Sequence, residues 1–254
     1  MVQGIKSALV TGGARRIGRA IALDLVEHGW AVAIHCNSSR FEAEALAHEI
    51  ILKGGTAAVV EADLNDPDHI AEVVPAANHA IGPLTLLINN ASLFEKDEAG
   101  DMNAALFEKH MRINVMAPTL LGQAFAAQRP RREAGNIVHL VDQRVWKLTP
   151  QFFSYTLSKT ALWAATRTMA QAFAPHVRVN AIGPGPTLAN VRQSATDFEK
   201  QEAATLLGHG PHLSEFGRTI RFLVDTPSIT GQMIALDGGQ HLAWETPDVV
   251  GIEE

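Results

Sequence analysis

Tyr155 and Lys159 are the residues of this sequence whose types and spacing point most directly to chemistry. A separation of four places both side chains on one face of a helix, where they can act on a single centre. The phenol has an ordinary pKa of about 10, and we expect a neighbouring ammonium group to lower it. The pair therefore suggests proton transfer beside a carbon that accepts hydride. The same spacing also occurs on exposed helices, so it needs support from other residues.

A glycine-rich segment, Thr11–Gly18, stands between a predicted strand and a predicted helix. In that position the backbone amides at the start of the helix can bind a pyrophosphate. Gly12 allows a tight turn, and Gly18 allows the helix and the strand to approach closely. Arg16 departs from the G-x-G-x-x-G pattern and would place a guanidinium at the mouth of the cofactor site. The segment predicts a dinucleotide-binding loop.

The residues after the second predicted strand indicate which nicotinamide cofactor is bound. Sheets that bind NAD place an acidic residue there for the ribose 2′-hydroxyl, but this strand is followed by Asn37-Ser38-Ser39-Arg40, with no carboxylate before Glu42. These donors, together with Arg15, suit a 2′-phosphate. The sequence therefore predicts NADP(H) rather than NAD(H). Asp63 closes the third predicted strand and is placed to bind the adenine amino group, although a helix-capping role explains it nearly as well.

The elements that must position these residues alternate along the whole chain. Short apolar runs predict strands, and the segments between them have helical periodicity. Such alternation predicts the α/β class: a single doubly wound Rossmann domain, residues 1–254, with a seven-stranded parallel sheet. The predicted strands are 8–11, 31–35, 57–60, 84–89, 136–141, 177–181 and 233–236, and the predicted helices are 16–28, 41–53, 67–80, 101–127, 152–174 and 212–224.

The segment from about 186 to 211 departs from this alternation of strands and helices. It is long, flanked by glycine and proline, and only weakly periodic, which is typical of a segment that covers a substrate. The alternative is an ordinary surface loop that does not contact a substrate.

Helix 152–174 has more apolar faces than one sheet contact requires, so we expect the protein to associate as a dimer or tetramer.

Composition argues against several other classes of protein. A formal net charge of −6 disfavours nucleic-acid binding, and the sequence contains no apolar run long enough to span a membrane. Cys36 is the only cysteine, which fits a reducing compartment, and we expect a cytoplasmic protein. His209 and His212 lack identifiable further ligands, so no metal site is predicted.

Taken together, these residues resemble the short-chain dehydrogenase/reductase family along essentially the whole chain. Further matching elements are Asn89-Asn90-Ala91, the Gly183-Pro184-Gly185 turn and Asp237-Gly238-Gly239. The resemblance implies that Asn114 orders a water through which Lys159 exchanges protons, that Ala91 lines the nicotinamide ribose and that Thr187 holds the carboxamide. The cofactor-binding residues expected from the loop, the strand ends and the resemblance are Gly12, Arg15, Arg16, Ile17, Gly18, Asn37, Ser38, Ser39, Asp63, Leu64, Asn90, Ala91, Ser92, Tyr155, Lys159, Pro184, Gly185 and Thr187.

Asp142 is the most informative departure from the family pattern. The family places a serine about thirteen residues before the tyrosine, and this chain has a carboxylate there. A serine hydroxyl can donate to a carbonyl oxygen that becomes negative, whereas an ionised carboxylate would oppose that charge. Asp142 instead suits a substrate that presents N–H donors and gains a proton on a ring nitrogen, as in the reduction of a C=N bond. A helix-capping carboxylate is the alternative interpretation.

Two more positions resemble the pteridine and dihydromonapterin reductase branch of the family. That branch carries an arginine where Arg16 stands, and it has an aromatic residue where Phe94 follows Asn-Asn-Ala-Ser-Leu. By this resemblance the pterin would lie between Phe94 and the nicotinamide, which suits a flat heteroaromatic ring. A core-facing aromatic is the alternative for Phe94. The residues predicted to bind the substrate are therefore Arg16, Phe94, Asp142 and Tyr155.

The resulting prediction is an NADPH-dependent enzyme that reduces a dihydropterin or dihydrofolate-like substrate by hydride transfer. Its predicted catalytic residues are Asn114, Asp142, Tyr155 and Lys159. One alternative is a general carbonyl or 3-oxoacyl-thioester reductase of the same fold. The other is a non-catalytic NADP(H)-binding sensor or scaffold, against which the intact set of Asn114, Tyr155 and Lys159 speaks.

Overall fold

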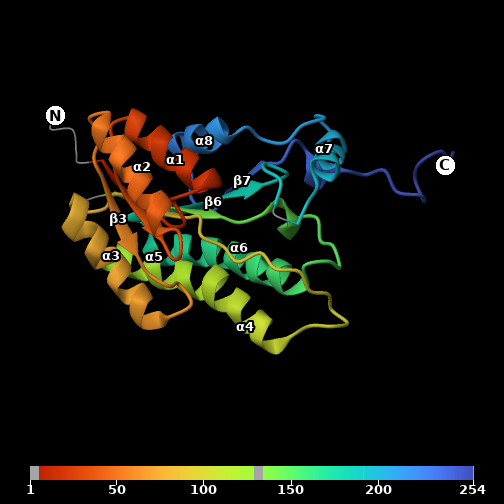
Figure 1. Ribbon diagram of the computed structural model, residues 1–254. Helices are drawn as coiled ribbons and strands as arrows, with labels where there is room; N and C mark the ends of the chain where they lie inside the picture. Colours follow the sequence, from red (N-terminus) through yellow and green to blue (C-terminus); the bar gives the residue numbers. More distant parts are fainter. Residues whose placement is uncertain (1–5, 129–133, 191, 254) are drawn as a thin grey trace.

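Seven parallel strands form the centre of the computed structural model, which describes residues 6–128, 134–190 and 192–253 (Figure 1). The strands are β1 (Ser7–Val10), β2 (Ala31–Cys36), β3 (Ala57–Glu61), β4 (Leu86–Asn89), β5 (Gly135–Leu140), β6 (Val177–Pro184) and β7 (Met233–Leu236). Their order in the sheet is β3-β2-β1-β4-β5-β6-β7, so the predicted α/β class and seven-stranded parallel sheet are confirmed. The central strands β1 and β4 are buried throughout, which explains their continuous apolar sequences.

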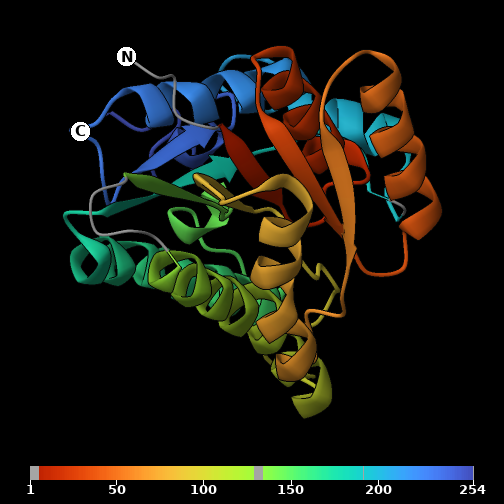
Figure 2. The ribbon, with the colours of Figure 1, turned by 90° about the vertical axis from the view of Figure 1, so that its left-hand side faces the viewer.

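Helices cover both faces of the sheet, as expected for a doubly wound fold. The helices are α1 (Arg16–Glu27), α2 (Arg40–Leu52), α3 (Pro67–Ile81), α4 (Ala104–Met111), α5 (Ala117–Ala127), α6 (Phe153–Phe173), α7 (Ala195–Ala203) and α8 (Leu213–Asp225). Helices α1, α2 and α8 lie on one face, and α3, α5 and α6 lie on the other (Figures 1 and 2). Each layer buries its own apolar cluster against the sheet. Fully burying one large apolar side chain contributes about 1.5–3 kcal/mol.

The strand order reverses beside β1, and this reversal fixes where a ligand can bind. β1 pairs with β2 on one side and with β4 on the other, so the connections leave β1 and β4 in opposite directions. In parallel sheets of this kind ligands bind at the carboxyl ends of the strands, at the point of reversal. The Thr11–Gly18 loop follows β1, and the segment that contains Phe94 follows β4. The fold therefore brings these two segments to one edge of the sheet.

One predicted helix, 101–127, is three elements in the structure. α4 ends at Met111, a π-helical turn occupies Arg112–Met116, and α5 begins at Ala117. Pro118 has no N–H, so the carbonyl of Asn114 receives no helical hydrogen bond from it. Turns of the π type occur often at functional sites, and this one contains Asn114.

The sequence prediction missed α7, which lies within the 186–211 segment. No residue of α7 is buried, so the helix has no apolar stripe to produce a helical period. Its start is nevertheless marked, because Ser194 Oγ accepts from the Asp197 backbone N–H at 3.1 Å. That Ser-x-x-Asp pattern is a recognised capping signal. No helix in the described ranges has the length and apolar content that crossing a membrane requires.

Two buried histidines in the sheet predict how stability depends on pH. Burial lowers the pKa of His35 to about 4 and that of His139 to about 3, whereas both are expected near 6.5 in the unfolded chain. As pH falls from about 6.5 toward 4, the unfolded chain takes up protons that the folded chain does not. The free energy of unfolding should therefore decrease by about 2 kcal/mol per histidine between pH 7 and pH 5.

Urea unfolding of the wild type and of His35→Asn and His139→Asn at pH 7 and pH 5 measures this effect. Each substitution should reduce the pH dependence by about 2 kcal/mol, the contribution of the histidine that it removes. His48→Asn, at an exposed helical position, is the matched control and should leave the dependence unchanged. Equal pH dependence in all four proteins would show that the buried histidines do not cause it.

Candidate active site

A direct hydrogen bond joins Asp142 and Tyr155. The Tyr155 hydroxyl donates to Asp142 Oδ2 at 2.8 Å, and the Arg144 backbone N–H donates to Asp142 Oδ1 at 2.8 Å. Asp142 follows the end of β5 and begins a 3₁₀ turn, Gln143–Val145, while Tyr155 lies in the first turn of α6. The capping interpretation of Asp142 is therefore also correct, since one carboxylate oxygen caps the turn and the other binds the phenol.

The environment of this pair favours a tyrosine that keeps its proton. Burial and the neighbouring Asp142 carboxyl raise the pKa of Tyr155 well above its ordinary value, and burial raises the pKa of Asp142. The expectation that Lys159 lowers the pKa of Tyr155 is therefore wrong for this arrangement. Lys159 Nζ donates to the Leu140 carbonyl at 2.7 Å, and burial lowers its own pKa to about 8. Tyr155 is thus placed as a hydrogen-bonded acid rather than as a phenolate.

Asn114 connects the active-site helix to the segment that follows β4. Its Oδ1 accepts from the Leu93 N–H at 2.8 Å, and its Nδ2 donates to Ser158 Oγ at 2.9 Å. The Ser158 hydroxyl in turn donates to the Tyr155 carbonyl at 2.7 Å. Because Phe94 directly follows Leu93, the side chain of Asn114 fixes the position of Phe94 relative to α6. Its expected role in ordering a water remains a prediction.

Phe94 belongs to an aromatic cluster beside Tyr155. Its ring stacks on Phe152 with centroids 4.4 Å apart and planes 8° apart, and it meets the Tyr155 ring edge-on at 4.6 Å. Sequence reasoning missed Phe152. This residue has a left-handed backbone with φ of 57°, a conformation that a bulky residue adopts only when its surroundings hold it there. No sequence pattern indicates either the conformation or the stacking.

A cleft of about 870 Å³ brings most of the predicted catalytic and substrate residues together. Phe94, Asp142 and Tyr155 line one part of it, beside the nicotinamide-end residues expected from the sequence. Of the predicted site residues, the cleft is lined by Arg16, Ile17, Asn90, Ser92, Phe94, Asp142, Tyr155, Lys159, Pro184, Gly185 and Thr187. The 186–211 segment contributes Leu188, Arg192 and several polar side chains, so it borders the cleft, as a covering segment would.

Arg16 joins the phosphate loop to the 186–211 segment. Its guanidinium donates to the carbonyls of Ala189 at 2.8 Å and Leu188 at 3.0 Å. Its backbone is left-handed, with φ of 51°, as suits a position where the family usually has glycine. Arg16 lines the cleft, but its contacts in this structure are to backbone rather than to Phe94 or Asp142. Its role toward substrate remains a prediction.

The phosphate loop has the close backbone packing that its glycines predict. Gly12 has φ of 59°, and a Cβ on Gly18 would lie 2.2 Å from the Gly12 carbonyl oxygen, so a larger residue would push helix α1 away from the loop. Thr11 Oγ1 accepts from the backbone N–H groups of Asn90 and Ala91 at 2.9 and 3.0 Å. The loop after β1 and the segment after β4 thus form one unit, and these residues fit a bound dinucleotide.

His35 also supports this loop, and sequence reasoning did not single it out. Its Nδ1 accepts from the Gly12 N–H at 3.2 Å, and its Nε2 lies 3.2 Å from the Ala62 carbonyl oxygen. Because its lowered pKa keeps the ring neutral at physiological pH, Nδ1 stays free to accept. The ring therefore joins the phosphate loop to the end of β3.

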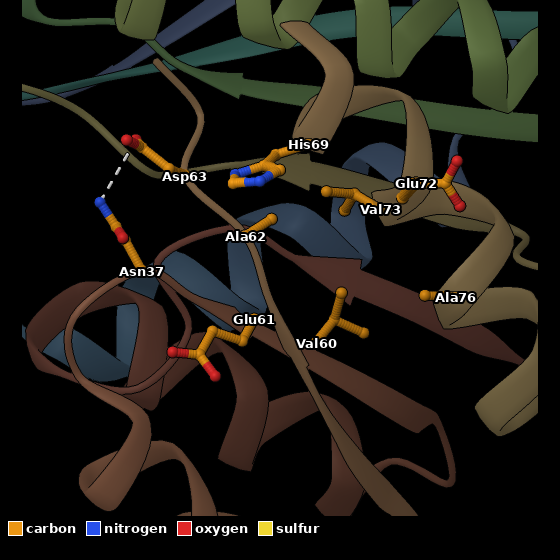
Figure 3. A pocket seen from close by; sticks show the side chains of 9 residues that line it. All are labelled: Asn37, Val60, Glu61, Ala62, Asp63, His69, Glu72, Val73 and Ala76. Carbon is orange, nitrogen blue, oxygen red and sulfur yellow. Dashed lines mark hydrogen bonds between the residues drawn. The ribbon is translucent and has the colours of Figure 1, made fainter. Parts of the chain in front are cut away.

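A second cavity, of about 380 Å³, lies at the ends of β2 and β3 (Figure 3). Asn37 and Asp63 point toward each other at one end of it, with Asn37 Nδ2 donating to Asp63 Oδ1 at 3.4 Å. Asp63 also accepts from the Asn65 N–H at 2.9 Å, and Leu64 between them is buried. The cavity lies where the sequence predicts the adenine end of the cofactor.

The arginines expected to bind a 2′-phosphate are already paired with carboxylates. Arg15 lies 3.1 Å from Glu42, and Arg40 lies 2.8 Å from Glu61. These pairs are largely exposed, so a phosphate can compete with the carboxylates for the guanidinium groups. Arg15, Ser38 and Ser39 line neither cavity. In the described residues no group of three histidine, cysteine or acidic side chains could hold a metal ion.

Asp97 fixes the start of α6 and was also missed from the sequence. Its buried carboxylate accepts from the Ser154 N–H at 3.0 Å and from the Ser154 hydroxyl. Asp97 follows Phe94 by three residues, and Ser154 immediately precedes Tyr155. The contact therefore ties the segment that carries the aromatic ring to the start of the helix that carries the acid.

Comparison with known proteins assigns the chain to a family. A model of short chain dehydrogenases matches residues 6–200, so the chain belongs to the short-chain dehydrogenase/reductase family, as its motifs indicated. The chain is 56% identical to FolM alternative dihydrofolate reductase 1 from Brucella canis, whose crystal structure is a complex with NADP. That match has a TM-score of 0.94 and covers 96% of this chain and 97% of the Brucella canis chain.

Two further relatives show how far the similarity extends. FolM alternative dihydrofolate reductase 1 from Brucella suis, also crystallised with NADP, is 54% identical with a TM-score of 0.95, over 98% of this chain and all (100%) of that chain. The 3-oxoacyl-[acyl-carrier-protein] reductase FabG of Staphylococcus aureus is 29% identical over 246 residues, covering 93% of this chain and 98% of the relative. The similarity to the FolM proteins is therefore much greater than that to FabG.

Asp97 gives a prediction about the stability of the active-site helix. Asp97→Ala should lower the free energy of unfolding by about 2–3 kcal/mol, because a buried helix start loses two hydrogen bonds. Asn103→Ala is the matched control, since Asn103 caps α4 at an exposed position with one bond, to the Leu106 N–H at 3.1 Å. It should cost only about 1 kcal/mol. Urea unfolding measures both values, and equal losses would contradict a special role for Asp97.

Proposed function

We propose that this protein is an NADPH-dependent reductase of dihydropterin or dihydrofolate-type substrates. The observation that carries the proposal is the 2.8 Å hydrogen bond from the Tyr155 hydroxyl to Asp142, in the place where ketone reductases of the family have a serine. The aromatic ring of Phe94 beside this pair supports the proposal, because the face that does not stack on Phe152 suits a flat heteroaromatic ring. The similarity to the two FolM alternative dihydrofolate reductases supports it further.

The residues present fit an NADP(H) cofactor, which when bound supplies the hydride. The amides of Gly12–Gly18 would hold the pyrophosphate, and Asp63 with Leu64 would hold the adenine. The 2′-phosphate would be held by Asn37, Ser38, Ser39 and Arg15. The nicotinamide end of the cofactor would be held by Ile17, Asn90, Ala91, Ser92, Lys159, Pro184, Gly185 and Thr187. The NADP complexes of the Brucella proteins support this choice of cofactor.

The acid pair accounts for the preference for a ring nitrogen. Tyr155 keeps its proton at neutral pH, because the ordinary pKa of a phenol is about 10 and burial raises the pKa of Tyr155 further. In the proposed reaction this phenol is the proton donor. Asp142 accepts the hydrogen bond that orients the phenol, and its carboxyl group can also accept from N–H groups of the substrate. A ketone has no such N–H groups. The developing negative oxygen of a ketone would moreover lie beside a carboxyl group, which disfavours that reaction.

The alternatives are less well supported. Similarity to FabG favours a 3-oxoacyl-thioester reductase, but at 29% identity and without any account of Asp142. A non-catalytic NADP(H)-binding role leaves the Asp142–Tyr155 bond and the buried Lys159 without a purpose.

We further propose that the segment 186–211 covers the substrate, that the chain forms a single NADP-binding domain, and that the protein acts in the cytoplasm as a homodimer or homotetramer. Leu157, an exposed apolar side chain on α6, would be available to such an interface.

A substrate panel tests the proposed function. Purified protein should oxidise NADPH with dihydrobiopterin or dihydrofolate at a kcat/KM at least about a hundredfold above that for simple ketones or acetoacetyl thioesters. Asp142→Ser should lower dihydropterin turnover by about 10²–10⁴-fold and raise ketone turnover, because serine can donate to a carbonyl oxygen. Tyr155→Phe is the control that should lose both activities. A wild type that prefers ketones would overturn the proposal.

Cofactor binding gives a separate prediction. NADPH should bind at least about tenfold more tightly than NADH, because charge-assisted hydrogen bonds to the 2′-phosphate are absent for NADH. Arg15→Gln should narrow this difference, whereas Arg112→Gln, which changes a half-exposed arginine on the π-helical turn, should not. Isothermal titration of each protein with both cofactors provides the measurement. Tighter binding of NADH by the wild type would refute the choice of cofactor.

A further inference from the structure

Arg144 places a positive charge in the cleft directly beside the acid pair. Its guanidinium lies 5.0 Å from the centre of the Phe152 ring and 5.8 Å from that of Phe94. Its backbone N–H is bonded to Asp142, so the start of the side chain is fixed two residues from the acid. The guanidinium itself donates only a long hydrogen bond, 3.4 Å, to Thr149 Oγ1 and forms no ion pair within the described residues. Its planar donor groups thus remain available to a ligand.

Arg192 approaches the same ring from the segment 186–211. Its guanidinium lies 5.5 Å from the centre of the Phe94 ring, and it donates to the Phe94 carbonyl at 2.7 Å and to Glu95 at 2.9 Å. Unlike Arg144, it is therefore balanced by a carboxylate. Two guanidinium groups from different elements flank the ring that we propose for substrate stacking.

The cleft is cationic although the protein is acidic. The whole chain has a formal net charge of −6. The cleft is lined by the cations Arg16, Lys96, Arg144, Lys159 and Arg192 and by the carboxylates Glu95, Asp142 and Asp197, an excess of two positive groups. Lys159 and Arg16 are accounted for by the acid pair and the phosphate loop. Of the remaining three cations, Lys96 pairs with Glu98 at 3.7 Å and Arg192 pairs with Glu95 at 2.9 Å. Arg144 is the one of these three without a carboxylate partner among the described residues, and it lies on the aromatic side of the cleft.

We propose that Arg144, assisted by Arg192, binds a carboxylate on the side chain of the substrate. The enzyme then takes dihydropterins whose side chain carries carboxylates, as in dihydrofolate, in preference to those whose side chain carries only hydroxyl groups. This inference rests on the proposed function, because it requires the pterin ring to lie at Asp142 and Tyr155. A planar guanidinium binds a carboxylate through two parallel hydrogen bonds, which an uncharged side chain cannot replace.

The test compares kcat/KM for dihydrofolate and dihydrobiopterin in the wild type and in Arg144→Gln. The ratio of the two values is the readout, since any effect of Arg144 on the acid pair changes both substrates alike and cancels. The substitution should lower the ratio about tenfold, mainly through the KM for dihydrofolate. Arg144→Lys should restore part of it. Arg167→Gln is the matched control, because Arg167 lies over the Trp163 ring at 5.9 Å and does not line the cleft.

Salt dependence provides a second readout. The KM for dihydrofolate should rise with salt concentration in the wild type and rise less in Arg144→Gln, because screening weakens an ion pair that the variant lacks. An unchanged ratio, or a fall in which both substrates are affected equally, would overturn the assignment of Arg144 to the substrate side chain. A wild type that reduces neither dihydropterin would instead contradict the proposed function, so the two failures are distinguishable.

Discussion

The hydrogen bond between Asp142 and Tyr155 is the interaction on which the rest of the active site depends. It forms only because the end of β5 and the first turn of α6 are held together, and several buried contacts serve this purpose. Asp97 fixes the start of α6, and Asn114 fixes the segment after β4 through Ser158. Both contacts also position Phe94. The ring that would stack on a substrate and the acid that would protonate it are therefore placed by the same set of hydrogen bonds.

The sheet supplies the second constraint, because its reversal at β1 brings the phosphate loop to this acid pair. Thr11 and Asn90 join the loop to the segment after β4, and Arg16 joins it to the segment 186–211. A ligand in the cleft is consequently bordered by segments from both halves of the chain. The left-handed backbone of Arg16 and of Phe152 indicates that local strain is accepted at the two places where these segments meet the cleft.

The fold could be predicted from sequence because each strand and most helices repeat a strong apolar pattern. The Tyr155–Lys159 pair, the glycine loop and Asp142 could be predicted because their meaning lies in spacing along the chain. By contrast, α7 has no buried face, and the π-helical turn depends on how Pro118 interrupts an otherwise continuous pattern. Arg144 and Phe152 gain their significance from neighbours in space, which spacing does not reveal. The pKa of Tyr155 depends on burial, so the sequence led to the wrong direction.

The protonation state of Tyr155 can be measured directly because it is the only tyrosine in the chain. Protein labelled with carbon-13 at the tyrosine ring carbon that bears the hydroxyl gives a single resonance, whose shift follows ionisation of the phenol. With Asp142 as its hydrogen-bond partner, the resonance should keep the value of a neutral phenol from about pH 6 to beyond about pH 10. In Asp142→Ser the midpoint should move to lower pH. A wild-type phenolate that forms with a midpoint at or below about pH 8 would contradict an acid pair built from Asp142 and Tyr155.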